Sequence, residues 1–180
     1  MDSRLISITP IDGRYNKDTE VLNSYFSEYA FIRYRIMIEI EYLIALNECN
    51  IYEENINDEE MVFFKSLYKD FNIDDAKRVL DIEEKTKHDV KAIEYFINEK
   101  IKNYESLRKK NIDTFVHFCL TSQDVNSTAN VMIIKSSISK VILPQVNEIL
   151  QLIKKYILDW SKIVMLSRTH GQPASPTFLG

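Results

Sequence analysis

Residues 142–157 read Ile-Leu-Pro-Gln-Val-Asn-Glu-Ile-Leu-Gln-Leu-Ile-Lys-Lys-Tyr-Ile, and this stretch decides the fold class. Its apolar residues recur every three or four positions, which is the spacing of one face of an α-helix. The stripe consists of Ile142, Val146, Ile149, Leu150, Ile153 and Ile157. Pro144 interrupts the pattern, and we expect a kink there because its ring clashes with the carbonyl four residues earlier.

The helix that contains this stripe is expected to be long. A helix over residues 125–163 would extend about 58 Å at about 1.5 Å per residue, whereas a compact domain of this size has a radius of gyration of about 16 Å. Such a helix would protrude, and its own chain would cover the apolar stripe only in part. We therefore expect other subunits or further helices to cover it.

Other segments predict further helices. Apolar residues from Tyr29 to Ile44 cover most of a helix circumference, which is typical of a helix inside a bundle. Arg35 and Glu39, four residues apart on this helix, are expected to form a solvated ion pair. Asn57-x-x-Glu60 has the spacing of a helix N-terminal cap.

Two segments are expected to be irregular. Residues 5–9 predict a short strand or an extended arm that ends in a turn. The polar and basic residues 100–111 predict a solvated connector. We place a domain boundary near Asn111, so that residues 1–111 form an N-terminal helical domain and residues 112–180 begin an elongated helical bundle.

The composition supports an all-α fold and excludes several classes of protein. The 180 residues include only 3 Gly and 4 Pro, too few for a turn-rich β-sandwich or barrel, and no Gly-rich phosphate-binding loop occurs. The net charge of −4 argues against a nucleic-acid-binding surface. Cys49 and Cys119 are too few for a disulfide scaffold or a zinc site, so we expect two reduced thiols.

The sequence also predicts a cellular location. The N-terminal residues lack the apolar core of a targeting peptide. The longest apolar runs are broken by charges, so no transmembrane span is expected. We therefore expect a cytoplasmic protein without membrane partners.

Two of the three histidines have contrasting surroundings. His88, in Thr86-Lys-His-Asp89, is expected at a helix N-terminus, where free backbone N–H groups favour an anion. The alternative is that Asp89 simply caps this helix. His117 is flanked by apolar residues and is expected to be a core histidine with a hydrogen-bond partner.

His170 lies in Ser167-Arg-Thr-His-Gly-Gln-Pro173, where we expect the long helix to end in a turn rich in Gly and Pro. A histidine that projects from such a turn can protonate a leaving amine, but a helix cap followed by a loop explains the pattern equally well. Arg14 and Tyr15 follow a Pro-x-Asp-Gly turn, and an arginine can bind phosphate or carboxylate through two hydrogen bonds. No metal-ligand spacing occurs in the sequence.

Four segments carry a resemblance to a known family. They are Pro10-Ile-Asp-Gly-Arg-Tyr15, Thr86-Lys-His-Asp-Val-Lys-Ala92 with Glu94-Tyr-Phe96, His117-Phe-Cys-Leu-Thr-Ser-Gln-Asp124 and Ser167-Arg-Thr-His-Gly-Gln-Pro-Ala174. In this order and spacing, across nearly the whole chain, they resemble the adenylosuccinate lyases of the fumarase/aspartase superfamily. The opening motif is most similar to that of bacterial-type members.

The resemblance implies an all-helical lyase of purine nucleotide and AMP biosynthesis, with no cofactor and no metal. Adenylosuccinate would be split by β-elimination into AMP and fumarate, and SAICAR into AICAR and fumarate. Such a reaction needs a base that removes a proton next to a carboxylate and donors that hold the resulting charge. It also needs an acid that protonates the departing nitrogen.

The resemblance further implies roles for individual residues. His170 would be the general acid, with Thr169 binding substrate beside it. Arg14 and Tyr15 would bind the phosphate end of the nucleotide.

The other implied residues lie at the two predicted helix starts. Lys87, His88 and Asp89 would contact the nucleotide, with His88 near the phosphate or assisting at the reacting centre. Thr121 and Ser122 would hold the succinyl carboxylates, helped by the N–H groups of a helix N-terminus.

One part of the family pattern is missing from the sequence. The Ser-Ser-x-Met-Pro-x-Lys-x-Asn-Pro type of loop, which carries the serine base, does not occur, and we expect it beyond Gly180. Members of the family are homotetramers whose sites draw residues from three subunits, which agrees with the uncovered stripe. We therefore expect an N-terminal portion of a lyase that has no turnover by itself.

Two other interpretations stay open. Another lyase of the superfamily, such as argininosuccinate lyase or fumarase, would share the mechanism. A helical oligomerisation module without chemistry explains the long stripe equally well, but it does not explain why the Thr-Ser, His-Asp and Thr-His-Gly-Gln groups all fall at predicted helix ends.

Overall fold

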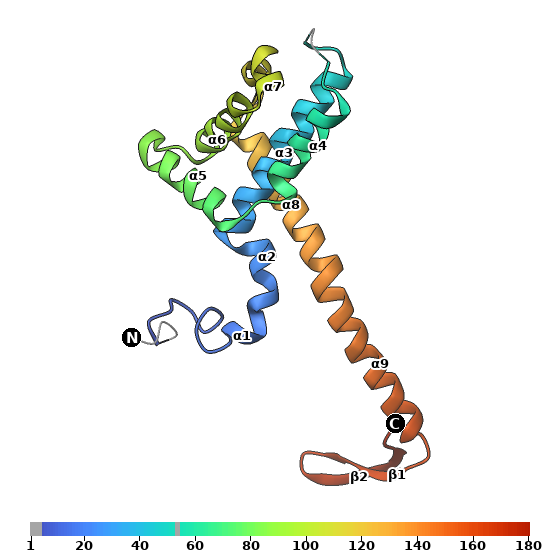
Figure 1. The fold of residues 1–180 in the computed structure, drawn as a ribbon. Coiled ribbons are helices and arrows are strands. Elements are labelled where there is room, and N and C mark those ends of the chain that lie inside the picture. The colour runs from blue at the N-terminus through green and yellow to red at the C-terminus, as the bar shows by residue number, and fades with distance from the viewer. Residues whose placement is uncertain (1–4, 53–54) are drawn as a thin grey trace. The chain divides into compact units, whose positions relative to one another are not determined.

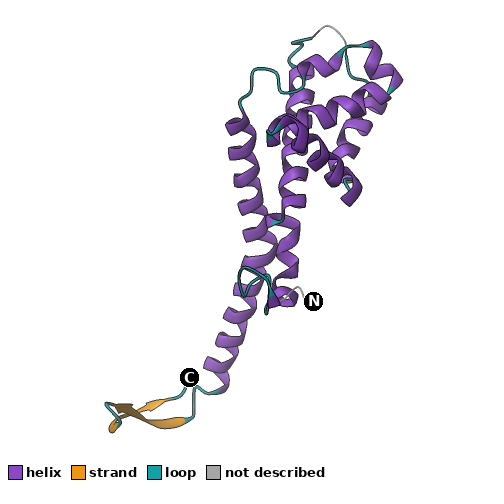
Figure 2. Ribbon diagram, turned by 90° about the vertical axis from the view of Figure 1, so that its left-hand side faces the viewer, coloured by secondary structure: helices purple, strands orange, loops and turns teal. Residues whose placement is uncertain are grey.

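The computed structural model describes residues 5–52 and 55–180, so the first four residues of the predicted N-terminal region lie outside the described part. Most of the described residues are helical, which confirms the predicted class, and an antiparallel pair of strands follows the last helix (Figure 2). The chain divides into two compact units, residues 1–136 and residues 137–180. The domain boundary expected near Asn111 stays a prediction.

Helices joined by short connections form the first unit (Figure 1). Residues 5–9 are bent rather than paired as a strand, and turns follow over residues 10–15. The elements are α1 (Asn16–Thr19), η2 (Glu20–Leu22), α2 (Asn23–Phe26), α3 (Glu28–Glu48), α4 (Asp58–Lys69), α5 (Ile73–Thr86), α6 (Asp89–Asn103), α7 (Glu105–Lys109), η3 (Ile112–Phe115) and α8 (Ser122–Ser137), whose last residue already belongs to the second unit.

Side-chain caps explain where several of these helices begin. The Ser27 side chain accepts a backbone N–H from the first turn of α3 at 3.2 Å. Asn57 and Glu60 form the predicted capping box of α4, in which each side chain accepts the other's backbone N–H at 2.9 Å. The Asn72 side chain caps α5 by accepting the backbone N–H groups of Asp74 and Asp75. These bonds satisfy N–H groups that have no partner within the helix.

The core of the first unit lies between α3, α4, α5 and α6, with η3 and α7 closing one end. Its fully buried members include Ile36, Ile40, Leu43, Phe64, Ile93, Phe96, Ile97, Ile101, Leu107 and Ile112. The prediction of a solvated connector over residues 100–111 is therefore wrong. These residues form the end of α6 and all of α7, because Ile101 and Leu107 anchor the segment in the core between its lysines.

A smaller apolar cluster attaches α8 to α3. Tyr34 of α3 packs with Ala129 and Ile133 of α8, and side chains from α2 and α3 surround them. Ala129 is completely buried and Ile133 nearly so. This cluster fixes the position of α8, and hence of its first residue, Ser122, against the helices of the first unit.

The second unit contains η4 (Ile138–Ile142), α9 (Leu143–Asp159), β1 (Val164–Thr169) and β2 (Gln172–Phe178). Element η4 is a π-helical turn that ends two residues before Pro144, and Leu143 N–H donates to the Ile138 carbonyl across it. A proline cannot donate to the helix ladder and clashes with the preceding turn. The interruption expected at Pro144 thus takes the form of a wider turn.

The expected end of the long helix is wrong. Helix α9 ends at Asp159, and the following residues form a hairpin in which Val164 pairs with Phe178 and Thr169 with Gln172. His170 and Gly171, with φ of 49° and 75°, form its two-residue turn. Positive φ at both central residues is typical of the tight turns that join antiparallel strands, and Gly adopts it without strain.

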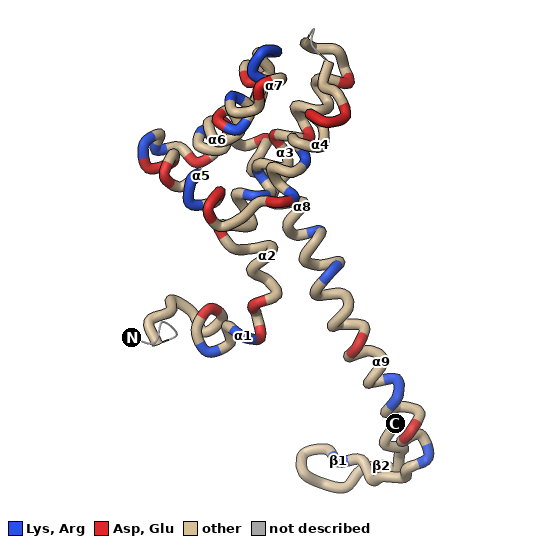
Figure 3. Tube along the Cα trace, in the orientation of Figure 1, with Lys and Arg blue, Asp and Glu red and all other residues tan. Residues whose placement is uncertain are grey.

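The six residues of the predicted apolar stripe are all exposed on the second unit, by 43–58%. Charged residues along α9 are sparse, in contrast to those on α4–α7 (Figure 3). Within the described part of the chain, no helix has the length and apolar character needed to cross a bilayer.

Candidate active site

His88 is the N-cap of α6. Its Nδ1 atom accepts the backbone N–H of Lys91 at 3.1 Å. A ring nitrogen can accept only when it carries no proton, so the neutral ring has its proton on Nε2. The alternative that Asp89 caps this helix is therefore wrong, because the imidazole takes that position.

The second ring nitrogen of His88 faces α8. Nε2 lies 3.3 Å from Oγ of Ser122, the first residue of α8. Since Nε2 bears the proton, it donates to the hydroxyl oxygen, and the Ser122 hydroxyl keeps its own proton for another acceptor. The contact brings the N-termini of α6 and α8 together, and each N-terminus presents backbone N–H groups that favour an anion.

Thr121 is oriented by its own helix. The Asp124 carboxylate accepts both the backbone N–H of Thr121 at 2.7 Å and its hydroxyl at 2.8 Å. These two bonds lower the pKa of Asp124, the backbone bond most. The Thr121 hydroxyl proton is thus directed at Asp124 in this structure, and Ser122 is the better placed of the two donors.

A buried arginine joins three helices beneath this point. Arg35 of α3 is only 4% exposed; its guanidinium binds the Asp89 carboxylate at the start of α6 and donates from Nε to Asn126 Oδ1 of α8 at 2.8 Å. The guanidinium also lies 3.8 Å from the centre of the Phe31 ring, a cation–π contact. Arg35 therefore ties the start of α6 to the first turns of α8.

The solvated pair expected between Arg35 and Glu39 is wrong. Both side chains are buried, and each has a different partner, Asp89 for Arg35 and His117 for Glu39. The core position expected for His117 is largely confirmed, since its side chain is 17% exposed and paired. The sequence of α3 contained a signal for this burial, because charged residues on a helix that is apolar all round must fall inside the bundle.

Lys87 is the C-cap of α5 and lies between α5 and α6. Its φ of 53° is left-handed, and its N–H donates to the Glu83 carbonyl at 2.7 Å. Its side chain is exposed beside His88. This backbone turn aims the His88 ring away from α5 and toward α8.

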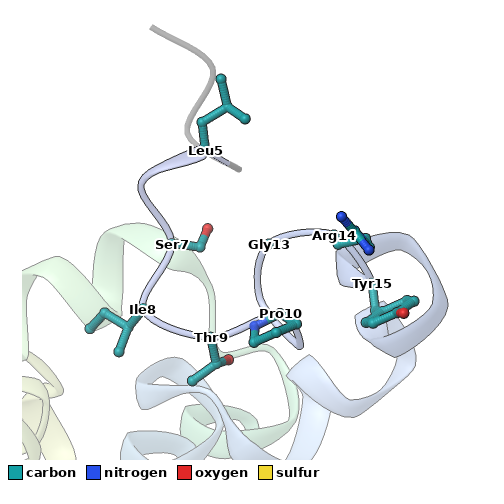
Figure 4. Close-up of a pocket in the computed structure, with 8 residues that line it drawn as sticks. All are labelled: Leu5, Ser7, Ile8, Thr9, Pro10, Gly13, Arg14 and Tyr15. Atoms are coloured by element: carbon teal, nitrogen blue, oxygen red, sulfur yellow. The ribbon is translucent and has the colours of Figure 1, made fainter.

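Arg14 and Tyr15 line a separate hollow of about 730 Å³ in the N-terminal segment. Figure 4 shows the two side chains next to each other, just before α1. The segment is held by bonds to Asp12, whose carboxylate accepts the Thr9 N–H at 3.0 Å and the Thr9 hydroxyl at 2.6 Å. The residues that line the hollow are Leu5, Ser7, Ile8, Thr9, Pro10, Gly13, Arg14 and Tyr15.

His170 and Thr169 belong to the second unit. His170 occupies the tip of the hairpin, and Thr169 is the last residue of β1. Both side chains are exposed. Of the predicted site residues, the structure therefore brings His88, Asp89, Thr121 and Ser122 together around two helix starts. In the described part of the chain, no cluster of His, Cys, Asp and Glu is suited to a metal ion.

Comparisons with known proteins show what the chain as a whole is similar to. The chain is 43% identical over 183 residues to adenylosuccinate lyase of Dictyostelium discoideum. It is 39% identical over 180 residues to that of Vibrio cholerae, and 36% identical over 180 residues to that of Haemophilus influenzae. Each alignment covers 99% of this chain and 39% of the relative, so the chain spans about two fifths of the length of these proteins.

A family model described as lyase matches residues 13–180, which include both helix starts and the hairpin. The match extends over most of the chain, and the resemblance carried by the four sequence segments points to the same group of proteins. The chain therefore belongs to the lyase family, within the fumarase/aspartase superfamily.

Proposed function

We propose that the protein carrying this chain is an adenylosuccinate lyase. It splits adenylosuccinate into AMP and fumarate, and SAICAR into AICAR and fumarate, by β-elimination. The observation that carries the proposal is the identity of 36–43% over 98–99% of the chain to proteins with this name. The small-molecule substrate and the absence of a nucleic-acid partner follow from the same assignment.

The two helix starts suit the anionic part of such a substrate. In the elimination, a C–H bond and a C–N bond break, a C=C bond forms, and negative charge develops next to a carboxylate before the nitrogen leaves. Hydrogen-bond donors that are already in place stabilise this charge. The Ser122 hydroxyl, the N–H groups of α8 and the Nε2–H of His88 form such a group of donors, and we assign the succinyl carboxylates to Thr121 and Ser122.

The remaining assignments use the chemistry of each side chain. Arg14 and Tyr15 bind the nucleotide phosphate, since a guanidinium and a phenol line one hollow. Lys87, exposed beside His88, adds positive charge for the nucleotide. Asp89 contacts the nucleotide and also supports the site through its ion pair with Arg35.

We assign the general acid to His170, assisted in substrate binding by Thr169. The turn of a hairpin presents the imidazole to its surroundings, and imidazole titrates close to neutral pH. We assign the general base to no residue of this chain. We therefore propose that residues 1–180 alone release no fumarate.

We further propose a homotetramer with shared sites that works in the cytoplasm. The apolar stripe on α9 is exposed along its length, and a stripe of this kind usually marks an interface. Cys49 and Cys119 are free and exposed, which suits a reducing compartment.

The test is fumarate release by the protein expressed from the natural reading frame that contains these residues, with adenylosuccinate and, separately, argininosuccinate or malate. Release from adenylosuccinate alone is the expected result. Release only from another substrate would assign a different lyase of the superfamily. No release from any of them would leave the oligomerisation module as the better interpretation.

Binding of AMP tests the nucleotide assignments separately. Arg14→Ala and His88→Ala should each weaken AMP binding by about tenfold or more, the effect of losing a hydrogen bond to a charged group. Arg108→Ala is the control, because Arg108 is exposed on α7 and lines no part of either site. Unchanged AMP affinity in both test variants would contradict the assignment.

A further inference from the structure

A buried acid–imidazole pair lies below the candidate site and has no role in the function proposed above. Glu39 Oε1 of α3 is 2.6 Å from Nδ1 of His117, and the Glu39 side chain is 0% exposed. Its second oxygen, Oε2, is buried without a hydrogen-bond partner in the described structure. Burying a carboxyl group with one oxygen unpaired is costly, so the pair calls for an explanation beyond packing.

The pair anchors the segment that leads into α8. Residues 116–121 connect η3 to α8, and both His117 and Cys119 have left-handed backbones, with φ of 60° and 55°. Residues other than Gly rarely adopt this conformation and need support from their surroundings. Helix α3 gives that support at two points three residues apart, since the Tyr42 hydroxyl also donates to the Phe118 carbonyl at 3.0 Å.

The chemistry of the pair defines the orientation of the ring. A carboxylate can only accept hydrogen bonds, so Nδ1 of His117 donates and the ring is fixed by that bond. Burial raises the pKa of Glu39, and the hydrogen bond from His117 opposes that rise. The other charged groups that face the pair are Glu94 of α6, which raises the pKa of Glu39, and Asp124 of α8, whose own pKa His117 helps to lower.

We propose that Glu39 is a positioning residue for the candidate site. Its carboxylate holds the His117 ring, the ring holds residues 116–121 in their left-handed turns, and those turns place Thr121 and Ser122 beside His88. Glu39 touches no substrate in this arrangement and acts through His117. The catalytic consequence rests on the proposed function, whereas the positioning itself does not.

Hydrogen exchange in the whole protein, expressed from its natural reading frame, tests the positioning. Glu39→Gln keeps the side-chain volume and removes the charge. We expect the backbone amides of residues 116–124 to exchange at least about tenfold faster in this variant, since a hydrogen bond to a charged group is worth a factor of roughly ten or more. Peptides from α5 should be unchanged. Glu48→Gln is the matched control, because Glu48 is exposed at the end of the same helix.

A second pair of variants shows whether Glu39 acts through His117. His117→Gln should produce the same local increase in exchange, and the double variant should exchange no faster than either single variant. Independent effects that multiply in the double variant would overturn the proposal. An unchanged rate at residues 116–124, or an equal rise over the whole first unit, would also overturn it. Glu39→Asp replaces Glu39→Gln if the latter does not fold.

Kinetics distinguish this inference from the proposed function. In a protein that releases fumarate, Glu39→Gln should raise KM for adenylosuccinate by about tenfold or more. The reason is that Thr121 and Ser122, the donors to the carboxylates of the substrate, are displaced. A wild-type protein without fumarate release would end the proposed function but would leave the exchange test valid. Faster local exchange with an unchanged KM would overturn the role of Glu39 in the site.

Discussion

Nε2 of His88 lies 3.3 Å from Oγ of Ser122, although 34 residues separate the two side chains. The contact exists because His88 uses its other nitrogen to cap α6, which turns Nε2 toward α8. Arg35 then holds both helix starts from below, through Asp89 and Asn126. The helix cap and the buried ion pair thus position two donors, the Nε2–H group of His88 and the Ser122 hydroxyl, next to each other.

Ser122→Ala tests the importance of this contact. We expect kcat/KM for adenylosuccinate to fall by about 10- to 100-fold, because the hydroxyl is the donor best placed for a carboxylate and removing it also leaves His88 Nε2 without its acceptor. The measurement is steady-state fumarate release by the protein from the natural reading frame. Ser127→Ala, an exposed serine on the same helix, should retain the wild-type value. Equal values for both variants would contradict the role of Ser122.

Arg35→Met tests the buried arginine. The substitution keeps an apolar chain of similar length but leaves the Asp89 carboxylate and the Asn126 amide without their partner. A fully buried pair broken in this way costs about 3–5 kcal/mol; Asp89 is 39% exposed, so we expect a loss of about 2–3 kcal/mol in the free energy of unfolding.

Chemical denaturation of the same protein measures this loss, and Arg33→Met is the matched control. Arg33 is two residues away on α3 and is partly exposed; it donates to the Ser24 carbonyl at 3.5 Å, and its guanidinium lies 5.3 Å from the centre of the Tyr34 ring. Its replacement should change the unfolding free energy by less than about 0.5 kcal/mol. A loss of the same size in both variants would mean that the ion pair with Asp89 is not the cause.

The sequence predicted the helices more reliably than the contacts between them. The cap at Asn57 and Glu60, the helix start at His88 and the helix start at Ser122 follow from local spacing, and all three occur. Local spacing contains no information on which helix starts meet. The approach of Ser122 to His88 depends on the packing of α8 against α3, which is a long-range property.

The errors in the prediction have physical causes of the same kind. Residues 164–178 form a hairpin because Gly171 accepts a positive φ and the strands pair on either side of it, whereas the apolar pattern before them resembles a continued helix. Arg35 and Glu39 were expected in solvent because their spacing is that of a surface pair. The apolar circumference of α3 points to their burial, but their partners, Asp89 of α6 and His117, are long-range contacts that no local pattern shows.

Glu60 makes the stability of the first unit sensitive to acid. Burial raises the pKa of its carboxyl group, but hydrogen bonds from Lys110, Ser106 and the Asn57 backbone together lower it below the ordinary value of 4.5. A carboxyl group whose pKa is lowered by folding stabilises the protein above its ordinary pKa, and this contribution is lost as the pH falls through the pKa of the folded state. The contribution of Glu60 is therefore complete near neutral pH and disappears in acid.

Comparison of Glu60→Gln with the wild type measures this contribution. Near pH 7 the variant should be less stable by about 1–3 kcal/mol, the value of hydrogen bonds to a buried charge, and the difference should shrink as the pH is lowered toward about 3. Glu59→Gln is the control, since Glu59 is exposed in the same helical turn. A difference that stays constant with pH would show that the charge of Glu60 is not responsible.

The apolar stripe of α9 predicts that copies of the protein associate through this helix. Ile149 and Ile153 are 58% and 48% exposed, and burying a carboxylate between such residues without a partner is strongly unfavourable. Ile153→Glu should therefore reduce the molar mass measured by light scattering or sedimentation from that of a tetramer toward that of a monomer. Gln151→Glu adds the same charge on the same helix at an exposed polar position and should leave the mass unchanged. A tetramer that survives Ile153→Glu would place the interface elsewhere, and fumarate release lost together with the tetramer would support sites shared between copies.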